Sequence, residues 1–236
     1  MSKEIYITFD MEWASDEVME YLIRLLKEYN IKSTLMVTHD TPLLGELRNS
    51  GLWELGIHPN FNKLLYGTDN RDYKNIIDDL LKIVPEAKCY RSHALTQGTL
   101  ISVYIKSKDV IYDLNNYIPV ESSIIPEPYA SPGGGVMLPF IFEDDLLFSS
   151  EDKSFNVEAY FQKEGLKIFN FHPINIFLNT DTLERYESAK IHNHDFDKLS
   201  GFVNNTQLGS KDVLIAIIKY GQSNNFTFKL ISDVTC

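Results

Sequence analysis

Hydrophobic residues in the first part of the chain follow two alternating spacings. Residues 5–9 form a short apolar run typical of a buried strand, and residues 16–29 repeat apolar positions every three or four residues, which predicts a helix. Ser15 suits the N-cap of this helix, and Asn30 suits a left-handed residue at its end. A second strand is expected over residues 34–38, so the chain begins in strand, helix, strand order.

The same alternation continues beyond this unit. Strands are expected over residues 55–58 and 88–92, and a helix with one apolar face is expected over residues 73–84, where Pro85 stops it. Short strands separated by helices are typical of crossover connections in a parallel sheet. The pattern therefore predicts an α/β fold.

The middle of the chain contains many prolines and glycines and has a weaker pattern. Short strands are possible over residues 110–114, 120–125 and 146–148, within a stretch that we expect to be irregular. The glycine run at 133–135 lacks the lysine and hydroxyl residue of a phosphate-binding loop, so we interpret it as a flexible turn. The regular pattern returns with a strand over residues 166–172.

The last part of the chain has one further helix and one further strand. Ser210 is expected to cap a helix that Gly221 ends, and a strand follows over residues 226–231. Neither a linker nor a repeat divides the sequence. We therefore expect residues 1–236 to form a single domain.

The composition limits the possible partners. The chain has 22 basic and 33 acidic residues, a formal charge of −11, which disfavours nucleic acid and anionic membranes as partners. No apolar run reaches the roughly 20 residues needed to span a bilayer, and the N-terminus leads directly into a strand, so we expect a cytoplasmic location. Cys89 and Cys236 give no disulfide framework and are expected to be free thiols, with Cys89 a buried filler in a strand.

Two carboxylates follow the first strand. Asp10 and Glu12 are two residues apart, so their side chains can point the same way and converge at the end of the strand. Such a pair can hold a divalent metal, or be divided by its surroundings into one ligand and one general base. Alone it is a weak signal, because acidic residues at strand ends are more often solvated or cap the next helix.

Three histidines also stand at the ends of predicted strands. His58 precedes Pro59, which halts the strand, while His93 follows Arg91 by two residues and His172 ends the strand over 166–172. Carboxyl ends of parallel barrel strands meet on one face, so these residues are expected to converge. The other histidines lack this arrangement: His39, His192 and His194.

Four elements in order resemble the NodB-homology polysaccharide deacetylases of carbohydrate esterase family 4. They are Thr8-Phe9-Asp10, Gly56-Ile57-His58-Pro59, Tyr90-Arg91-Ser92-His93 and Phe171-His172-Pro173, and the last strand resembles the family's closing strand. The resemblance implies a distorted (β/α)7 barrel, a divalent metal that is usually zinc, and removal of an N-acetyl or O-acetyl group from a sugar. Asp10 matches the family's catalytic base.

The sequence departs from the family pattern at two metal ligands. The family's metal-binding acid directly follows the base, whereas Met11 intervenes here and Glu12 is the nearest substitute. The family's second motif has two histidines four apart, whereas this chain has His58 and then Asn62. Zinc prefers nitrogen to an amide oxygen, which favours Glu12, His58 and His93 as ligands, although Asn62 stays open as the completing residue.

A mechanism follows from this ligand set. A bound metal lowers the pKa of its water from 15.7 to about 7 and polarises the acyl carbonyl. We hypothesise that Asp10 takes the water's proton, that Arg91 orients Asp10 through a fork-like ion pair, and that His172 protonates the leaving group. The candidate substrate contacts are Trp13, Asn62 and Tyr66, with Phe61 as a further aromatic side chain that could stack on a sugar. Single aromatic residues such as Trp13, Phe61 and Tyr66 are, however, more often packing residues.

Two other functions remain open at this level. A metal-free hydrolase of cyclic amides on the same barrel would explain the missing second histidine. A carbohydrate-binding or assembly protein without catalysis would tolerate the altered motifs, because fold does not determine function. For a deacetylase without an export signal, we expect a nucleotide-linked or lipid-linked acylated sugar from surface polysaccharide synthesis as the substrate.

Overall fold

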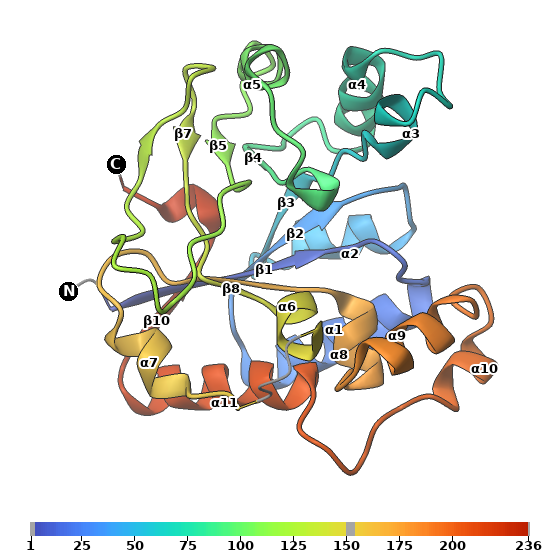
Figure 1. Cartoon of the computed structure of the whole chain (residues 1–236), viewed down its shortest axis with the longest axis vertical. Helices are drawn as coiled ribbons and strands as arrows, with labels where there is room; N and C mark the ends of the chain where they lie inside the picture. Colours follow the sequence, from blue (N-terminus) through green and yellow to red (C-terminus); the bar gives the residue numbers. More distant parts are fainter. Residues whose placement is uncertain (1–2, 150–153, 236) are drawn as a thin grey trace.

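The strands of this computed structural model, which describes residues 3–149 and 154–235, belong to one strongly curved sheet (Figure 1). The order is β6-β7-β5-β4-β3-β2-β1-β9-β8, and β10 also pairs with β1. Neighbouring strands are parallel except for the pair β6 and β7. The strands are β1 (Glu4–Asp10), β2 (Ser33–Val37), β3 (Trp53–Ile57), β4 (Cys89–Tyr90), β5 (Tyr112–Asp113), β6 (Tyr129–Ala130), β7 (Val136–Met137), β8 (Phe142–Glu143), β9 (Ile168–Phe171) and β10 (Thr227–Lys229).

Helices connect most of these strands. They are α1 (Asp16–Tyr29), α2 (Leu43–Asn49), α3 (Asn62–Leu65), α4 (Tyr73–Ile83), α5 (Thr99–Lys106), α6 (Asp144–Ser149), α7 (Val157–Gln162), α8 (Pro173–Leu178), α9 (Leu183–Lys190), α10 (Phe196–Ser200) and α11 (Ser210–Ser223), with 3-10 turns η1 (His93–Leu95) and η2 (Ile231–Asp233). The predicted α/β class is confirmed. The sheet curls into a partial barrel, and its strand count differs from a strict (β/α)7 repeat.

Strand β1 lies at the centre of the fold because both of its faces are buried. Ile5, Ile7 and Phe9 join the large core between the sheet and the outer helices. Tyr6 faces the inside of the curved sheet, in a second core that also contains Met36, Cys89, Leu114, Leu138, Phe140 and Ile168. Alternation of side chains along the strand then carries Thr8 and Asp10 to this same inner face.

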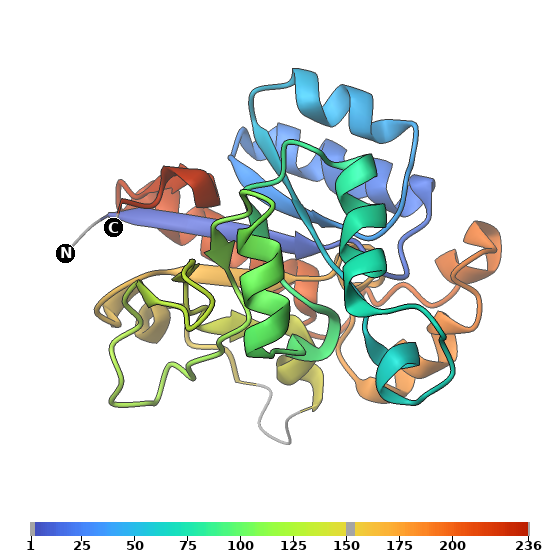
Figure 2. The same cartoon turned by 90° about the horizontal axis from the view of Figure 1, so that it is seen from above.

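Helices α1, α8 and α11 form a layer along one side of the central strands (Figure 1). Helix α1 has the predicted bounds, and Asn30 ends it in the predicted left-handed conformation, with φ 50°. Ser15 occupies the N-cap position, but its side chain makes no capping hydrogen bond, contrary to the prediction. In the view from above, α4 and α5 lie side by side over the strands β3 to β5 (Figure 2).

Helix α11 differs from its prediction at both ends. Gly209 rather than Ser210 occupies the N-cap, and the helix continues past Gly221 to Ser223. Gly221 is required by packing and not by a turn, since an added Cβ would lie 2.6 Å from Ile5 Cδ1 and 3.1 Å from Phe228 Cζ. The helix therefore approaches β1 and β10 closely at this position.

The irregular middle was predicted only in part. Residues 110–114 contain β5, but residues 120–125 form turns, and residues 146–148 lie in helix α6, so these two strand predictions were wrong. Asp144 and Asp145 stand in the first turn of α6, where acidic side chains interact favourably with the helix dipole. The glycine run is a turn between β6 and β7, with Gly134 at φ +85°.

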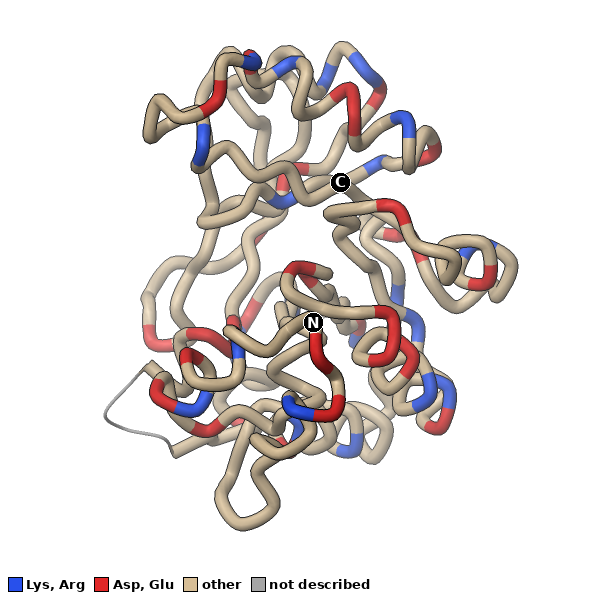
Figure 3. The backbone as a smooth tube through the Cα atoms, turned by 90° about the vertical axis from the view of Figure 1, so that its right-hand side faces the viewer, with Lys and Arg blue, Asp and Glu red and all other residues tan. Residues whose placement is uncertain are grey.

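The remaining sequence predictions concern thiols, charge and membranes. Cys89 is free and buried, as predicted, whereas Cys236 lies outside the described residues. Basic and acidic positions are interspersed along the chain in the view of Figure 3. Among the described residues, no helix combines the length and apolar character needed to cross a bilayer.

Candidate active site and metal centre

The residues predicted to carry out catalysis or bind a metal meet at the carboxyl ends of the central strands. Asp10 is the last residue of β1, His58 follows β3, Arg91 follows β4 and His172 follows β9. Neighbouring parallel strands end at one edge, so four segments far apart in sequence reach one cavity of about 330 Å³. Asp10, Arg91, His58 and His172 are each at most 4% exposed.

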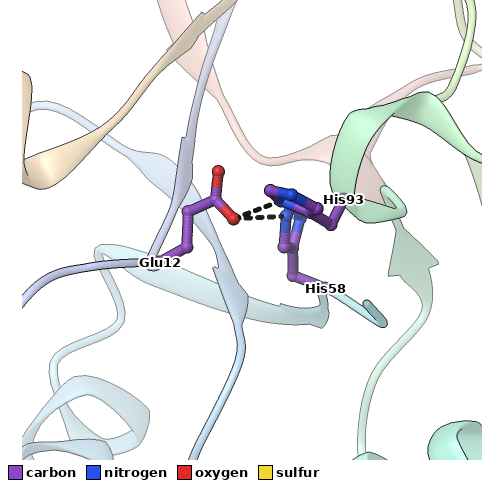
Figure 4. Close-up of side chains that lie close together, drawn as sticks. All are labelled: Glu12, His58 and His93. Carbon is purple, nitrogen blue, oxygen red and sulfur yellow. Dashed lines mark ion pairs between the residues drawn. The ribbon is translucent and has the colours of Figure 1, made fainter. Parts of the chain in front are cut away.

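Glu12 is the centre of a cluster of histidines. Its carboxylate contacts His93 Nδ1 directly and lies 3.7 Å from His58 Nε2, and His172 Nε2 is 3.4 Å from its other oxygen. Figure 4 shows the Glu12 carboxylate pointing toward the His58 and His93 rings, which come from different segments. One ligand atom from each of these three residues lies within 4.8 Å of the others.

The chemistry of this trio fits a divalent cation. Both ring nitrogens of His58 and the Nδ1 of His93 are buried, and none makes a hydrogen bond with the described residues. The Glu12 and Asp10 carboxylates lie close to these nitrogens without hydrogen-bond geometry, and a cation between the nitrogens and Glu12 would satisfy them. Two imidazoles and one carboxylate form a donor set suited to zinc, and three protein ligands leave a position for water.

Asp10 is held by a network on the inner face of the sheet. Arg91 Nη1 donates to Asp10 Oδ1 at 3.0 Å, and Asn170 Nδ2 donates to Asp10 Oδ2 at 2.9 Å. The same Nη1 also donates to Thr8 Oγ1 and to Asn170 Oδ1, while Arg91 Nε donates to the Leu114 carbonyl. The predicted fork-like pair is therefore a single Arg91–Asp10 contact, and Asn170 holds the second carboxylate oxygen.

These neighbours determine the protonation state of Asp10. Burial opposes its charge, but the Arg91 guanidinium and the adjacent His58 hold the pKa of Asp10 well below its usual range. Burial would also lower the pKa of His58, yet the carboxylates of Asp10 and Glu12 raise it to about 9. Asp10 is thus an ionised carboxylate, as a general base must be.

His172 is oriented by two acidic residues. Its Nδ1 lies 2.7 Å from Asp144 Oδ1 and its backbone N–H donates to Asp144 Oδ2 at 3.1 Å, while Asp145 is 3.5 Å away. Burial disfavours the charged ring, but the negative charges of Asp145 and Asp144 raise the pKa of His172 well above 6.5. A protonated His172 has its Nε2 free to face Glu12 and Asp10.

Sequence reasoning gave no role to Asn170, Glu143 or Asp144. The run Glu143-Asp144-Asp145 was hidden because β8 has just two residues and the following helix was interpreted as a possible strand. Three consecutive acids before an apolar segment are a helix-start signal that could have located this element.

The predicted substrate contacts are divided between two environments. Trp13 is 40% exposed and borders a cavity of about 530 Å³ beside Glu12 and His58, with Lys190 Nζ 4.3 Å from its ring centre. Phe61 is 2% exposed and packs in the core, so of its two alternatives it is a packing residue and not a sugar-stacking wall. Asn62 and Tyr66 border neither this cavity nor the cavity of about 330 Å³ lined by Asp10 and His172, which we call the reaction cavity. Their predicted roles therefore have no geometric support.

The backbone beside two of the candidate ligands is unusual. Trp13, Ala94 and Leu95 have φ between 51° and 58°, a region that L-residues other than Asn and Asp seldom occupy. They directly follow Glu12 and His93. Backbone strain of this kind persists where the surrounding structure imposes it, and it is common at functional sites.

Known proteins share this fold. One of these proteins is WbmS from Bordetella bronchiseptica, which is assigned as a polysaccharide deacetylase involved in O-antigen biosynthesis. Its sequence is 33% identical to this chain, and its crystal structure superimposes with a TM-score of 0.85 over 92% of this chain and 90% of that chain. A family 4 acetyl xylan esterase from Clostridium thermocellum, in complex with a cobalt ion, is 14% identical with a TM-score of 0.50 over 98% of this chain and 89% of that chain, which shows the fold alone. Comparison with curated protein sequences gives no match.

The family model of WbmS-like polysaccharide deacetylases matches residues 7–190, a range that includes the four motifs and Glu12, His58 and His93. The resemblance identified from those motifs is confirmed, and so is the predicted enzyme class, a carbohydrate deacetylase. On this match and the similarity to WbmS, the chain belongs to the WbmS-like family of polysaccharide deacetylases.

Proposed function

We propose that this deacetylase is metal-dependent and removes an N-acetyl group from a sugar-containing precursor of a surface polysaccharide. The observation that carries the proposal is the group of Glu12, His58 and His93, whose ligand atoms converge and whose buried ring nitrogens make no hydrogen bond with the described residues, beside Asp10 and His172. A base, an acid and a cation-binding group thus border the same cavity. Metal-assisted hydrolysis of an amide uses all three.

The proton transfers are divided between Asp10 and His172, which both border the cavity. When bound, a zinc ion would supply a water of lowered pKa and polarise the acyl carbonyl. Asp10, held ionised by Arg91 and Asn170, is placed to accept the proton of that water. His172, protonated against Asp144, donates a proton to the nitrogen that leaves.

The substrate is proposed from two supports. WbmS of Bordetella bronchiseptica is assigned to O-antigen biosynthesis, which supports an acylated sugar of a surface polysaccharide. The cavity beside Trp13 offers an aromatic side chain and the polar groups of Asn60 and Asp40, which suit a sugar ring. A nucleotide-linked or lipid-linked form of the sugar, a cytoplasmic location and a single domain over residues 1–236 remain parts of the proposal.

Metal analysis combined with acetate release tests the proposal. We expect about one zinc ion per wild-type chain, marked loss of zinc in His58→Ala and His93→Ala, and retention in Asn62→Ala. Asp10→Asn should retain zinc while losing most turnover on a panel of N-acetylated sugars. Wild-type zinc content in both histidine variants would refute the ligand set.

Removal of the metal separates the alternatives. Activity that survives exhaustive chelation would favour the metal-free hydrolase, because water without a cation is a poor nucleophile at neutral pH. Sugar binding with no acyl release from any substrate would favour a carbohydrate-binding protein.

A further inference from the structure

Glu143 stands in the reaction cavity without a role in the mechanism above. It ends β8 and pairs in register with Asn170 of the parallel strand β9. Paired residues of neighbouring strands point to the same side of a sheet, and the Asn170 side chain contacts Asp10. The Glu143 carboxylate therefore faces the same inner cavity, which it borders together with Asp10, Arg91 and His172.

Its two acidic neighbours in the sequence are both engaged. Asp144 holds His172, and Asp145 accepts a hydrogen bond from Asn175 Nδ2 at 2.8 Å. Glu143 is partly buried, and no hydrogen bond or ion pair joins it to a residue of the described ranges 3–149 and 154–235. Because its carboxylate borders the cavity without a protein donor, it is available to accept a hydrogen bond from a bound molecule.

The position of Glu143 indicates what that donor is. A Glu143 oxygen, an Asp10 oxygen and a ring nitrogen of His172 lie within 4.8 Å of one another. In the proposed mechanism His172 contacts the leaving atom of the substrate, so that atom also lies within reach of Glu143. When the leaving atom is an amide nitrogen, it carries a hydrogen that a carboxylate can accept.

We propose that Glu143 accepts a hydrogen bond from the N–H of the scissile amide and thereby selects N-acylated over O-acylated sugars. This inference rests on the proposed function. An ester places an oxygen with lone pairs at the same point, where it meets a carboxylate and offers no hydrogen. A site that hydrogen-bonds an N–H group discriminates strongly against an analogue lacking it.

The reaction balances with Glu143 as an acceptor throughout. Water forms a bond to the carbonyl carbon and gives a proton to Asp10, and the C–N bond breaks as His172 gives a proton to nitrogen. The nitrogen keeps its original hydrogen on Glu143 and leaves as an amine, with acetic acid as the second product. The proton on Asp10 returns to His172 through solvent.

The test compares an amide and an ester on the full-length, zinc-loaded protein. The variants are Glu143→Leu, which removes the acceptor, Glu143→Gln, which keeps the shape and a weaker acceptor, and the control Glu121→Gln, an exposed acid of the adjoining cavity. The probes are N-acetylglucosamine oligosaccharides with UDP-N-acetylglucosamine as amides, and 4-nitrophenyl acetate as ester. Zinc content is measured for every variant.

We expect kcat/KM for the amide to fall about 10- to 100-fold in Glu143→Leu and less in Glu143→Gln, while the ester is cleaved as well as before. Glu121→Gln should behave as wild type, and all variants should keep zinc. Equal losses on amide and ester, no loss on either, or loss of zinc in Glu143→Leu would each overturn the inference. If the wild type cleaves neither probe class, the proposed function fails first and this inference fails with it.

Discussion

Arg91 offers a sharp test of how Asp10 is held. The guanidinium is fully buried, donates to Asp10 Oδ1 at 3.0 Å and lies 4.7 Å from the Phe140 ring centre. Replacing it with methionine keeps a long apolar side chain in contact with Phe140 but leaves the Asp10 charge with the Asn170 amide and the His58 ring, whose Nδ1 is 3.4 Å from Asp10 Oδ1.

The expected cost comes mainly from the charge that is left behind. Removing one partner of a buried ion pair typically destabilises a protein by about 3–5 kcal/mol, because the other charge stays uncompensated. Lost packing contributes less, since methionine fills much of the same space. We expect Arg91→Met to lose about 3–5 kcal/mol at pH 7, and Arg91→Met/Asp10→Asn to recover at least about 2 kcal/mol of it.

Urea unfolding followed by circular dichroism measures both variants, with Arg91→Lys as the control that keeps a positive charge. Asp10 without Arg91 should also have a higher pKa, so the loss in Arg91→Met should shrink as the pH falls and Asp10 becomes protonated. A double variant no more stable than Arg91→Met, with a loss independent of pH, would show that Arg91 acts through packing alone.

Three further predictions concern stability and strain. Burial raises the pKa of Glu143 from 4.5 to about 7, so its contribution to the unfolding free energy is fully present below pH 4.5 and is lost as the pH rises to 7. In the presence of chelator, the unfolding free energy of Glu143→Gln should therefore rise relative to wild type by roughly 3 kcal/mol between pH 4.5 and pH 7. A difference in urea unfolding that does not depend on pH would contradict this. Ala94→Gly should raise the unfolding free energy by about 0.5–1 kcal/mol by relieving the left-handed backbone, while zinc affinity falls because His93 is held less firmly; lower stability would argue against strain. Gly221→Ala should lower the unfolding free energy by about 1–3 kcal/mol, because the new Cβ would crowd Ile5 and Phe228. A melting temperature equal to that of the wild type would show that α11 can shift.

The sequence was informative wherever structure depends on local spacing. The bounds of α1 follow from apolar residues at helical intervals, and the left-handed Asn30 follows from its side chain. It was less informative in the middle, because strands of two residues such as β5 and β8 contain too few positions for a period to be visible. Helix α6, which directly follows the two-residue strand β8, was missed, and the N-cap of α11 was misplaced by one residue.

The chemistry was likewise predictable residue by residue but not as a network. Amino-acid type and strand-end position were enough to select Asp10, Glu12, His58, His93 and His172, because few residue types bind a cation or move a proton. Which of them contact one another, and which acid serves which base, depends on the curvature and register of the sheet.

The sequence by itself determined the alternation of strands and helices, the family motifs and the side chains able to do the chemistry. Only the tertiary structure decided that Asn170 holds Asp10, that Asp144 rather than Glu143 orients His172, and that Phe61 belongs to the core. The physical reason is that periodicity and residue type are local properties. Contacts between residues some 30 to 160 positions apart depend on how distant strands pair.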